Sequence, residues 1–230
     1  MKKVLLSLVL ASNLLASNLN IAAAANIAYP LNELKKIFED LHPDIKLNIN
    51  SGVSGAFNAQ IKNGAEYDVF LAANMDFAKD LENLVNNKAI TYAKGKLLLF
   101  SAKKTPSLDD LKTASCIAIA NPKTAPYGQA AKEVLEKVPN SKNIITATNI
   151  QATLLQATKA CDYAFIAASS LEQLKELGYS EKNILKLDDN LYEPILQGMI
   201  ITSKNPDSKV FFDFLLSDKS KEVFSKYGYE

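Results

Sequence analysis

The chain has 230 residues, in which 26 basic side chains stand against 25 acidic ones and 48% of the residues are hydrophobic. This length suits one large domain or two lobes of about 100 residues each, and the composition is that of an ordinary globular protein. Because the charges are scattered along the sequence, the basic stripe of a nucleic-acid surface is missing, and DNA or RNA binding is not expected.

All 26 basic residues are lysines. Arginine is the usual bidentate partner of phosphate and carboxylate groups, so an anion bound here must be held by neutral donors or by lysine ammonium groups. The same composition also arises in a lysine-biased proteome without any functional cause.

The N-terminus predicts a secretory signal peptide over residues 1–17. Met1-Lys2-Lys3 is a short basic start, Val4–Leu10 is an apolar middle, and a small-residue stretch follows as far as Ser17. The apolar run is too short for a spanning helix of about 20 residues. We therefore expect cleavage near residue 16 or 17 and an exported, soluble mature protein.

Strand-like and helix-like runs alternate from residue 20 onward. Apolar or alternating runs predict strands, and apolar residues at helical spacing predict helices. Strands are predicted over 20–24, 45–49, 68–73, 96–101, 117–120, 143–145 and 163–167, and helices from 30, from 56, and over 75–86, 107–112, 129–138 and 151–160. This alternation is typical of parallel sheets and an α/β fold, in which ligands bind beyond the carboxyl ends of the strands.

Four short polar or glycine-bearing turns come between a strand and a helix: Ala25-Asn26, Ser51–Gly55, Ala125–Gly128 and Asn149–Gln151. Helix N-termini expose unpaired N–H groups and a partial positive charge, so these turns would form an anion site without any cationic side chain if they converged. Each turn taken alone is equally explained as a helix cap or tight turn. Their occurrence in two separate stretches favours two lobes that face one cleft.

Other chemistry-bearing residues are few. Cys116 and Cys161 each lie beside a strand-like run, and the sequence leaves open whether they form a disulfide or remain two buried thiols. The single histidine, His42, stands where a helix should end, so we expect a surface residue and neither a metal site nor a cofactor. Asp188-Asp189 and Glu39-Asp40 are adjacent carboxylates that point in different directions. An exported α/β enzyme is therefore the less favoured reading, and we expect no catalytic activity.

Seven motifs follow one another from about residue 20 to the C-terminus: Ala22–Asn26, Ser51–Gly55 with Ala59–Ile61 after it, Asn63–Phe70, Tyr92–Leu97, Asn121–Gly128, Tyr192–Pro194 and Tyr227–Tyr229. In this order they resemble the periplasmic molybdate/tungstate-binding proteins of ABC transporters, the ModA family. The resemblance implies a type II periplasmic-binding-protein fold: α/β, with two lobes and a ligand cleft between them that closes by a hinge motion. Lobe I would comprise residues 18–95 and 197–230, and lobe II residues 96–196.

Carried over position by position, the resemblance implies ligand contacts from Ala25, Asn26 and Ser54 in lobe I and from Tyr127 and Ile150 in lobe II. Asn26 would offer its side-chain amide and main chain, and Ser54 its hydroxyl and main chain. Tyr127 and Ile150 would donate chiefly through main-chain N–H groups. Ala25, where relatives often carry a hydroxyl residue, would contribute only through its main chain. The metal of the oxyanion would have no direct protein ligand.

The implied function is capture of molybdate or tungstate and delivery to an inner-membrane ABC permease, by a receptor that is monomeric when free. A fully ionised anion needs only donors, whereas hydrogen phosphate carries a proton that needs an acceptor, and the predicted site has no carboxylate to provide one. Sulfate is smaller and would leave fixed donors out of reach. The alternative is an exported receptor of the same fold for another anion or a small organic acid.

Overall fold

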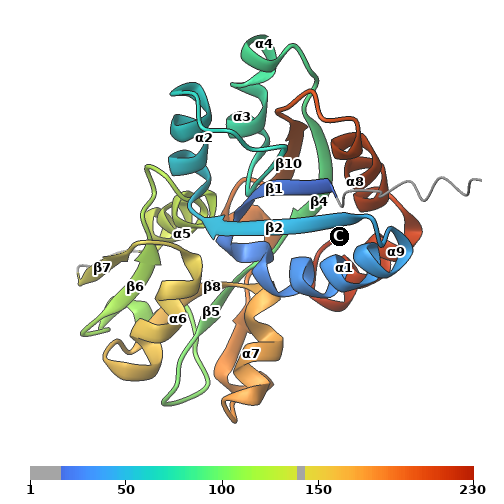
Figure 1. Ribbon diagram of the computed structural model, residues 1–230. Helices are drawn as coiled ribbons and strands as arrows, with labels where there is room; N and C mark the ends of the chain where they lie inside the picture. The colour runs from blue at the N-terminus through green and yellow to red at the C-terminus, as the bar shows by residue number, and fades with distance from the viewer. Residues whose placement is uncertain (1–16, 139–142) are drawn as a thin grey trace, which may run out of the picture.

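The computed structural model describes residues 17–138 and 143–230, which form two five-stranded sheets with helices packed on their faces (Figure 1). All but the last residue of the predicted signal peptide lies outside these residues. Within the described part, no helix is both long and apolar enough to cross a membrane.

The first sheet has the strand order β2-β1-β3-β10-β4. Its strands are β1 (Ser17–Ala24), β2 (Ile45–Gly52), β3 (Val69–Ala72), β4 (Ile90–Gly95) and β10 (Ile195–Ile201). β1 pairs in parallel with β2 and β3, whereas β10 runs antiparallel to β3 and β4. A strand from late in the chain therefore lies between two strands from the first hundred residues.

The second sheet has the strand order β7-β6-β8-β5-β9. Its strands are β5 (Leu97–Phe100), β6 (Ile117–Ala120), β7 (Ile144–Ala147), β8 (Tyr163–Ala167) and β9 (Ile184–Lys186). β6 is parallel to β7 and β8, and β5 is antiparallel to β8 and β9. Both sheets are thus mixed, not purely parallel as the alternation of elements suggested, because the strand that enters each sheet from the other one, β10 in the first sheet and β5 in the second, runs opposite to its neighbours.

Alternate residues of the first sheet enter two different cores. Leu19 and Ile21 of β1 pack with α1 (Ala28–Leu41), α8 (Asp207–Leu215) and α9 (Asp218–Lys226), while Ala22 packs on the other face with α2 (Ser54–Lys62), α3 (Met75–Lys79) and α4 (Glu82–Val85). Burial of each large apolar side chain contributes about 1.5–3 kcal/mol. Because both faces are covered, the central strands are continuous apolar runs, which is why they were predictable.

The second sheet is covered in the same way. α5 (Pro126–Lys137) packs against Leu99 and Ile119 on one face, and α6 (Ile150–Lys159) with α7 (Leu171–Glu176) packs against Leu98 and Phe100 on the other. Five 3-10 segments complete the described elements: η1 (Ala25–Ile27), η2 (Asp109–Lys112), η3 (Ala168–Ser170), η4 (Glu181–Asn183) and η5 (Asp189–Leu191).

The single helix predicted over 75–86 is wrong in one respect, because it is two short helices. α3 ends at Lys79, and the N–H of Leu81 bonds back to Ala78 O over three residues instead of four. This tighter turn redirects the chain and brings the Leu81 side chain to 0% exposure. α4 then ends at Val85, and the next residue, Asn86, has the left-handed conformation with φ 53°.

Candidate functional site

A small cavity lies between the helix starts that follow strands of the two sheets. Its lining consists of Ala24, Ala25, Asn26, Gly52, Val53, Ser54, Ala73, Ala125, Pro126, Tyr127, Asn149 and Ile150. The space open to a water-sized sphere is about 10 Å³, which is about the room that one water molecule needs and far below the few hundred Å³ of an organic-ligand pocket. None of these twelve residues has a charged side chain.

The structure brings together all five residues predicted to contact a ligand. Each lines this cavity, and each is at most 4% exposed. They come from four turns that are as much as 125 positions apart in the sequence, between residue 25 and residue 150. Their placement is what an anion site at converging helix starts requires, and their role as donors stays a prediction.

Three of the four helix starts lack a side-chain cap. The N-cap residues Ala24, Val53 and Ala125 make no capping hydrogen bond, whereas Asn149 Oδ1 accepts from the N–H of Ala152 at 2.9 Å. Uncapped N-terminal N–H groups normally find a side chain or water, since leaving them buried and unpaired costs about 1–3 kcal/mol each. A bound anion would satisfy them together.

The main-chain N–H groups of Tyr127 and Ile150 are donors of this kind. Each lies in the first turn of its helix, where no intrahelical acceptor exists, and we find no other hydrogen-bond partner for them among residues 17–138 and 143–230. By contrast, the N–H of Gly55 in α2 donates to Thr124 O at 3.1 Å. That bond joins the two sides of the cavity, so the site is in a closed arrangement.

Ser54 is held so that its hydroxyl can donate. Its Oγ accepts a 3.0 Å hydrogen bond from the N–H of Ala73 at the end of β3, and the residue is 2% exposed. A hydroxyl that accepts one bond still has its own proton to give. No acceptor for that proton occurs in the described part of the chain, so the cavity is where it is available.

Asn26 ties its turn to distant parts of the chain through its side chain. Its Nδ2 donates to Gln197 Oε1 at 2.7 Å and to Tyr229 Oη at 2.8 Å, which uses both amide hydrogens. Its main-chain carbonyl oxygen accepts from Ser169 Oγ at 2.5 Å and from Tyr229 Oη at 2.9 Å. Both amide hydrogens thus anchor the turn to protein acceptors, whereas the main-chain N–H is the other donor that was predicted for the anion; the predicted contact between the side-chain amide and an anion stays a prediction.

Gln197, Ser169 and Tyr229 form a buried support that the sequence analysis did not assign. Gln197 is 0% exposed, and its Nε2 donates to Ala73 O at 3.1 Å, the same residue whose N–H holds Ser54. Burial raises the pKa of Tyr229 to about 12, although its contacts with Ser169 and Asn26 oppose the shift. The sequence did contain an indication that Gln197 has a special role, because it is the lone polar side chain in the apolar run of β10.

Comparison with known proteins identifies the family. The model of the family described as bacterial extracellular solute-binding protein matches residues 19–230. The chain belongs to this family. The molybdate-binding protein ModA of Azotobacter vinelandii is 36% identical over 93% of this chain and 90% of its own length, and ModA of Rhodobacter capsulatus is 33% identical over 90% and 86%.

Solved structures of solute-binding proteins agree with this assignment. The periplasmic molybdate-binding protein of Azotobacter vinelandii superposes with a TM-score of 0.81 at 30% identity, over 92% of this chain and 98% of that one. A sulfate-binding protein of Mycobacterium tuberculosis has a TM-score of 0.72 at 11% identity, over 93% of this chain and 86% of that one. The second likeness shows the fold alone. The expected α/β fold of the periplasmic binding proteins is thereby confirmed.

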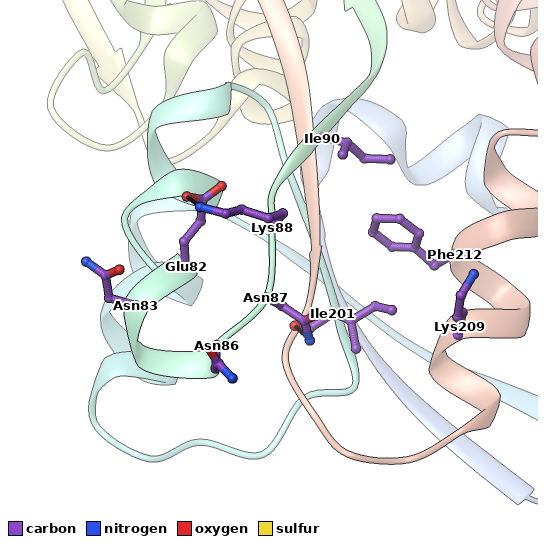
Figure 2. Close-up of a pocket in the computed structure, with 9 residues that line it drawn as sticks. All are labelled: Glu82, Asn83, Asn86, Asn87, Lys88, Ile90, Ile201, Lys209 and Phe212. Carbon is purple, nitrogen blue, oxygen red and sulfur yellow. Dashed lines mark hydrogen bonds and ion pairs between the residues drawn. The ribbon is translucent and has the colours of Figure 1, made fainter.

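One of the larger hollows lies well away from the cavity, and its charged groups are not free for an anion. A pocket of about 510 Å³ is lined by Glu82, Asn83, Asn86, Asn87, Lys88, Ile90, Ile201, Lys209 and Phe212 (Figure 2). Its charged groups are already paired: Glu82 binds Lys88 and the N–H of Ala89, and Lys209 Nζ lies 2.6 Å from an oxygen of Asp213. The pocket opens beside α4 and α8, away from the four converging turns.

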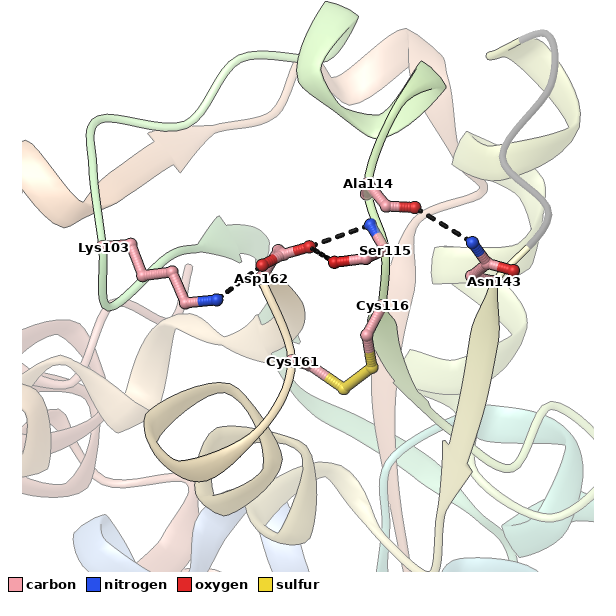
Figure 3. Close-up of a disulfide and its surroundings, with 7 residues drawn as sticks. All are labelled: Lys103, Ala114, Ser115, Cys116, Asn143, Cys161 and Asp162. Atoms are coloured by element: carbon pink, nitrogen blue, oxygen red, sulfur yellow. Dashed lines mark hydrogen bonds and ion pairs between the residues drawn. A yellow bond between two sulfur atoms is a disulfide. The ribbon is translucent and has the colours of Figure 1, made fainter.

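Cys116 and Cys161 are joined in a disulfide, which settles the open alternative (Figure 3). Both precede strands of the second sheet, so the bond lies at the amino ends of β6 and β8, opposite the cavity. Next to it, Asp162 accepts from Lys103 Nζ at 2.6 Å and from the N–H and hydroxyl of Ser115. These contacts hold the pKa of the Asp162 carboxyl well below its usual range, with Lys103 the largest cause.

His42 lies where α1 ends and is half-buried, with its ring centroid 4.7 Å from that of Phe38. One side of its ring therefore packs on Phe38 of the first core, and the residue is partly exposed, as a surface residue at the end of a helix can be. Within residues 17–138 and 143–230, no group of three or more His, Cys, Asp or Glu side chains could hold a metal ion.

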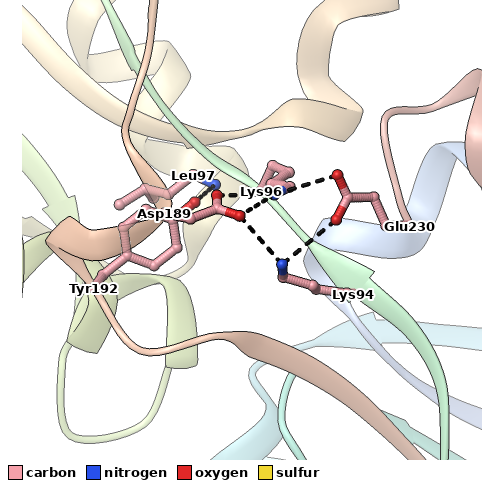
Figure 4. A network of polar contacts seen from close by, with 6 residues as sticks. All are labelled: Lys94, Lys96, Leu97, Asp189, Tyr192 and Glu230. Atoms are coloured by element: carbon pink, nitrogen blue, oxygen red, sulfur yellow. Dashed lines mark hydrogen bonds and ion pairs between the residues drawn. The ribbon is translucent and has the colours of Figure 1, made fainter.

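Charged side chains gather where the chain crosses between the sheets (Figure 4). Lys96 Nζ lies 2.7 Å from Asp189 and 3.3 Å from the Glu230 side chain, and Lys94 Nζ lies 3.2 Å and 3.4 Å from the same two groups. Burial disfavours the charged form of Lys96, but its two carboxylate partners outweigh this and raise its pKa. The network ties both crossing segments to the C-terminus without entering the cavity.

Proposed function

We propose that this protein is a periplasmic receptor that captures molybdate and delivers it to an ABC permease in the inner membrane. The observation that carries the proposal is the convergence of uncapped helix starts and the Ser54 hydroxyl on a small cavity lined without charged side chains. Such a site offers donors to an anion and little else. The identity of 36% to a molybdate-binding protein supports the choice of ligand.

The proposed contacts are the main-chain N–H groups of Ala25, Asn26, Tyr127 and Ile150, together with the hydroxyl and main chain of Ser54. These donors come from both sides of the cavity, and the anion would complete the first turns of the helices. Donors fixed at the ends of sheet strands cannot move inward to follow a smaller ion. Tungstate, which is nearly isosteric with molybdate, should therefore bind, and sulfate should not.

The proposed lobes are residues 18–95 with 197–230 and residues 96–196, joined at the two crossings. Opening would break the bond between Gly55 N–H and Thr124 O and the bond between Ser169 Oγ and Asn26 O. Both involve backbone groups that water can satisfy in the open form, so the cost of opening is modest. The receptor would bind by hinge closure as a monomer, with no cofactor and no catalysis.

The test is calorimetry on the mature chain, expressed from residue 18, stripped of bound anions, and titrated with molybdate, tungstate, sulfate and phosphate. We expect one-to-one binding of molybdate and tungstate and no competition from a large excess of sulfate. A folded sample that gives no heat with either metal oxyanion would refute the assignment. Binding of phosphate or of a small organic acid in its place would favour the alternative receptor of the same fold.

A further inference from the structure

Gly95 stands where the chain leaves the first sheet. It is the last residue of β4, pairs with Ile195 of β10, and is followed within two residues by β5 of the second sheet. Its φ is not among the positive values of the described glycines, which belong to Gly64, Gly178 and Gly228. Glycine is therefore not needed here for backbone conformation, and what it supplies is space.

The space at Gly95 is filled by the end of the Tyr127 ring. A Cβ at position 95 would overlap the Tyr127 hydroxyl and would lie 3.0 Å from its Cζ and 2.9 Å from Gln197 Nε2. The Tyr127 side chain is 1% exposed, and its hydroxyl has no hydrogen-bond partner within the described residues. Burial raises the pKa of Tyr127 well above its usual value, so the group stays neutral. The hydroxyl is thus packed, not bonded.

Tyr127 consequently has two ends with different surroundings. Its main-chain N–H is in the first turn of α5 beside the cavity, and its ring end lies between Gly95 and Gln197 of the first-sheet strands. Gln197 in turn holds Asn26 and, through Ala73, the strand end that positions Ser54. The depth to which the ring enters this gap therefore fixes how far α5 stands from Asn26 and Ser54.

We propose that the gap at Gly95 sets the extent of lobe closure on the anion, with Gly95 as a positioning residue that never touches the ligand. The inference rests on the proposed function, because anion affinity is its main readout. Filling a packed gap with one methyl group forces neighbours apart. Hydrogen bonds to the anion need donor distances of about 2.7–3.2 Å. If α5 is held outward and the rest of the second lobe moves with it, the bonds from the Tyr127 and Ile150 N–H groups weaken together.

The experiment compares wild type with Gly95→Ala, using molybdate titration, melting temperature with and without molybdate, and small-angle scattering. We expect molybdate affinity to fall about 10- to 100-fold, the range that corresponds to the usual cost of overpacking. The melting temperature without ligand should fall less than that with ligand, and scattering should show a less compact bound form. Gly178→Ala is the matched control: it introduces a methyl at φ +84° with open space around it, which strains the fold but should leave affinity within about twofold.

A second background isolates the contact itself. The Tyr127→Phe variant lacks the overlapping oxygen. In that background, the fold-loss of molybdate affinity caused by Gly95→Ala should be at least five times smaller than the fold-loss in the wild-type background. If Gly95→Ala alone does not fold but the double variant does, this rescue of folding by Tyr127→Phe shows that the two residues are in steric conflict.

Three results would overturn the inference: wild-type affinity in Gly95→Ala, an equal loss in both backgrounds, or failure of both variants to fold. Absence of molybdate binding by wild type would instead refute the proposed function, and scattering with whichever anion does bind would then test closure.

Discussion

Replacement of Ser54 by alanine separates the binding role of this residue from its structural one. The change removes a hydroxyl that accepts from the N–H of Ala73 at 3.0 Å, and both residues are at most 3% exposed. The Ala73 N–H would be left buried and unpaired, which costs about 1–3 kcal/mol of folding free energy. For a chain of this size, that lowers the melting temperature by roughly 2–4 °C per kcal/mol.

The effect of Ser54→Ala on affinity comes from the loss of the hydroxyl hydrogen, whereas the effect on stability comes from the loss of the hydroxyl oxygen. The Ser54 hydroxyl proton has no protein acceptor in the described part of the chain, so its bond to the anion would be a charge-assisted one. Loss of such a bond costs about 1.5–3 kcal/mol, or roughly 10- to 150-fold in the dissociation constant. Ser54→Ala should therefore weaken molybdate binding by at least tenfold as well as lowering the melting temperature.

Ser220→Ala is the matched control for this variant. Ser220 is 0% exposed and its Oγ donates to Phe214 O at 2.7 Å, far from the cavity in α9. Its replacement should lower the melting temperature by a comparable amount and leave affinity unchanged. Calorimetric titration and thermal unfolding of the three proteins decide the matter. If Ser54→Ala binds molybdate as tightly as wild type, the hydroxyl does not face the anion and the site is wrongly built.

Three further predictions concern the supports of the site and of the second sheet. Asn26→Ala should lower both affinity and melting temperature, because it leaves Gln197 Oε1 buried without its donor; a stable variant of wild-type affinity would contradict this. Joint replacement of Cys116 and Cys161 by alanine should lower stability by about 2–4 kcal/mol in denaturant unfolding, yet leave affinity within about twofold, since the bond is at the opposite end of the sheet. Asp162→Asn should lower the melting temperature at pH 7. Because the folded pKa of Asp162 lies below the unfolded value of 3.8, the stabilisation is complete above that value and is lost as pH falls through the folded pKa. The difference from wild type should therefore shrink only below about pH 4, and a difference that disappears already between pH 7 and 5 would rule out this cause.

Much of the fold was accessible from the sequence because the strands are buried on both faces. β6 and β8 were predicted with their observed bounds, since residues 117–120 and 163–167 are wholly apolar runs. β4 was missed because Ile90–Gly95 mixes exposed and buried residues without regular alternation. The helices starting at Ser54 and Pro126 begin two and three residues before the predicted positions, as the polar turns themselves form the first helical turn.

The supports of the candidate site were less accessible than its lining. The cavity residues stand in recognisable turns between a strand and a helix, so local sequence indicates them. The partners of the Asn26 amide are 171 and 203 positions away in the sequence, at Gln197 and Tyr229. Nothing in the local pattern around residue 26 specifies these two partners of its side chain. Only the pairing of β10 beside β3 brings Gln197 to it.

In the proposed site, attraction by charge and selection by size would come from different groups. An anion receptor built on ammonium groups would bind by charge, and flexible lysine stems would adapt to anions of several sizes. Here Lys94 and Lys96, which lie near the crossing segments, are paired with Asp189 and Glu230, and no charged side chain lines the cavity. The remaining donors are N–H groups held at strand ends and helix starts, together with one hydroxyl that Ala73 fixes in place. Such donors attract any anion weakly at long range but bond well only to one whose oxygens reach all of them. A rigid set of neutral donors therefore converts a difference in bond length between two equally charged anions into a difference in affinity.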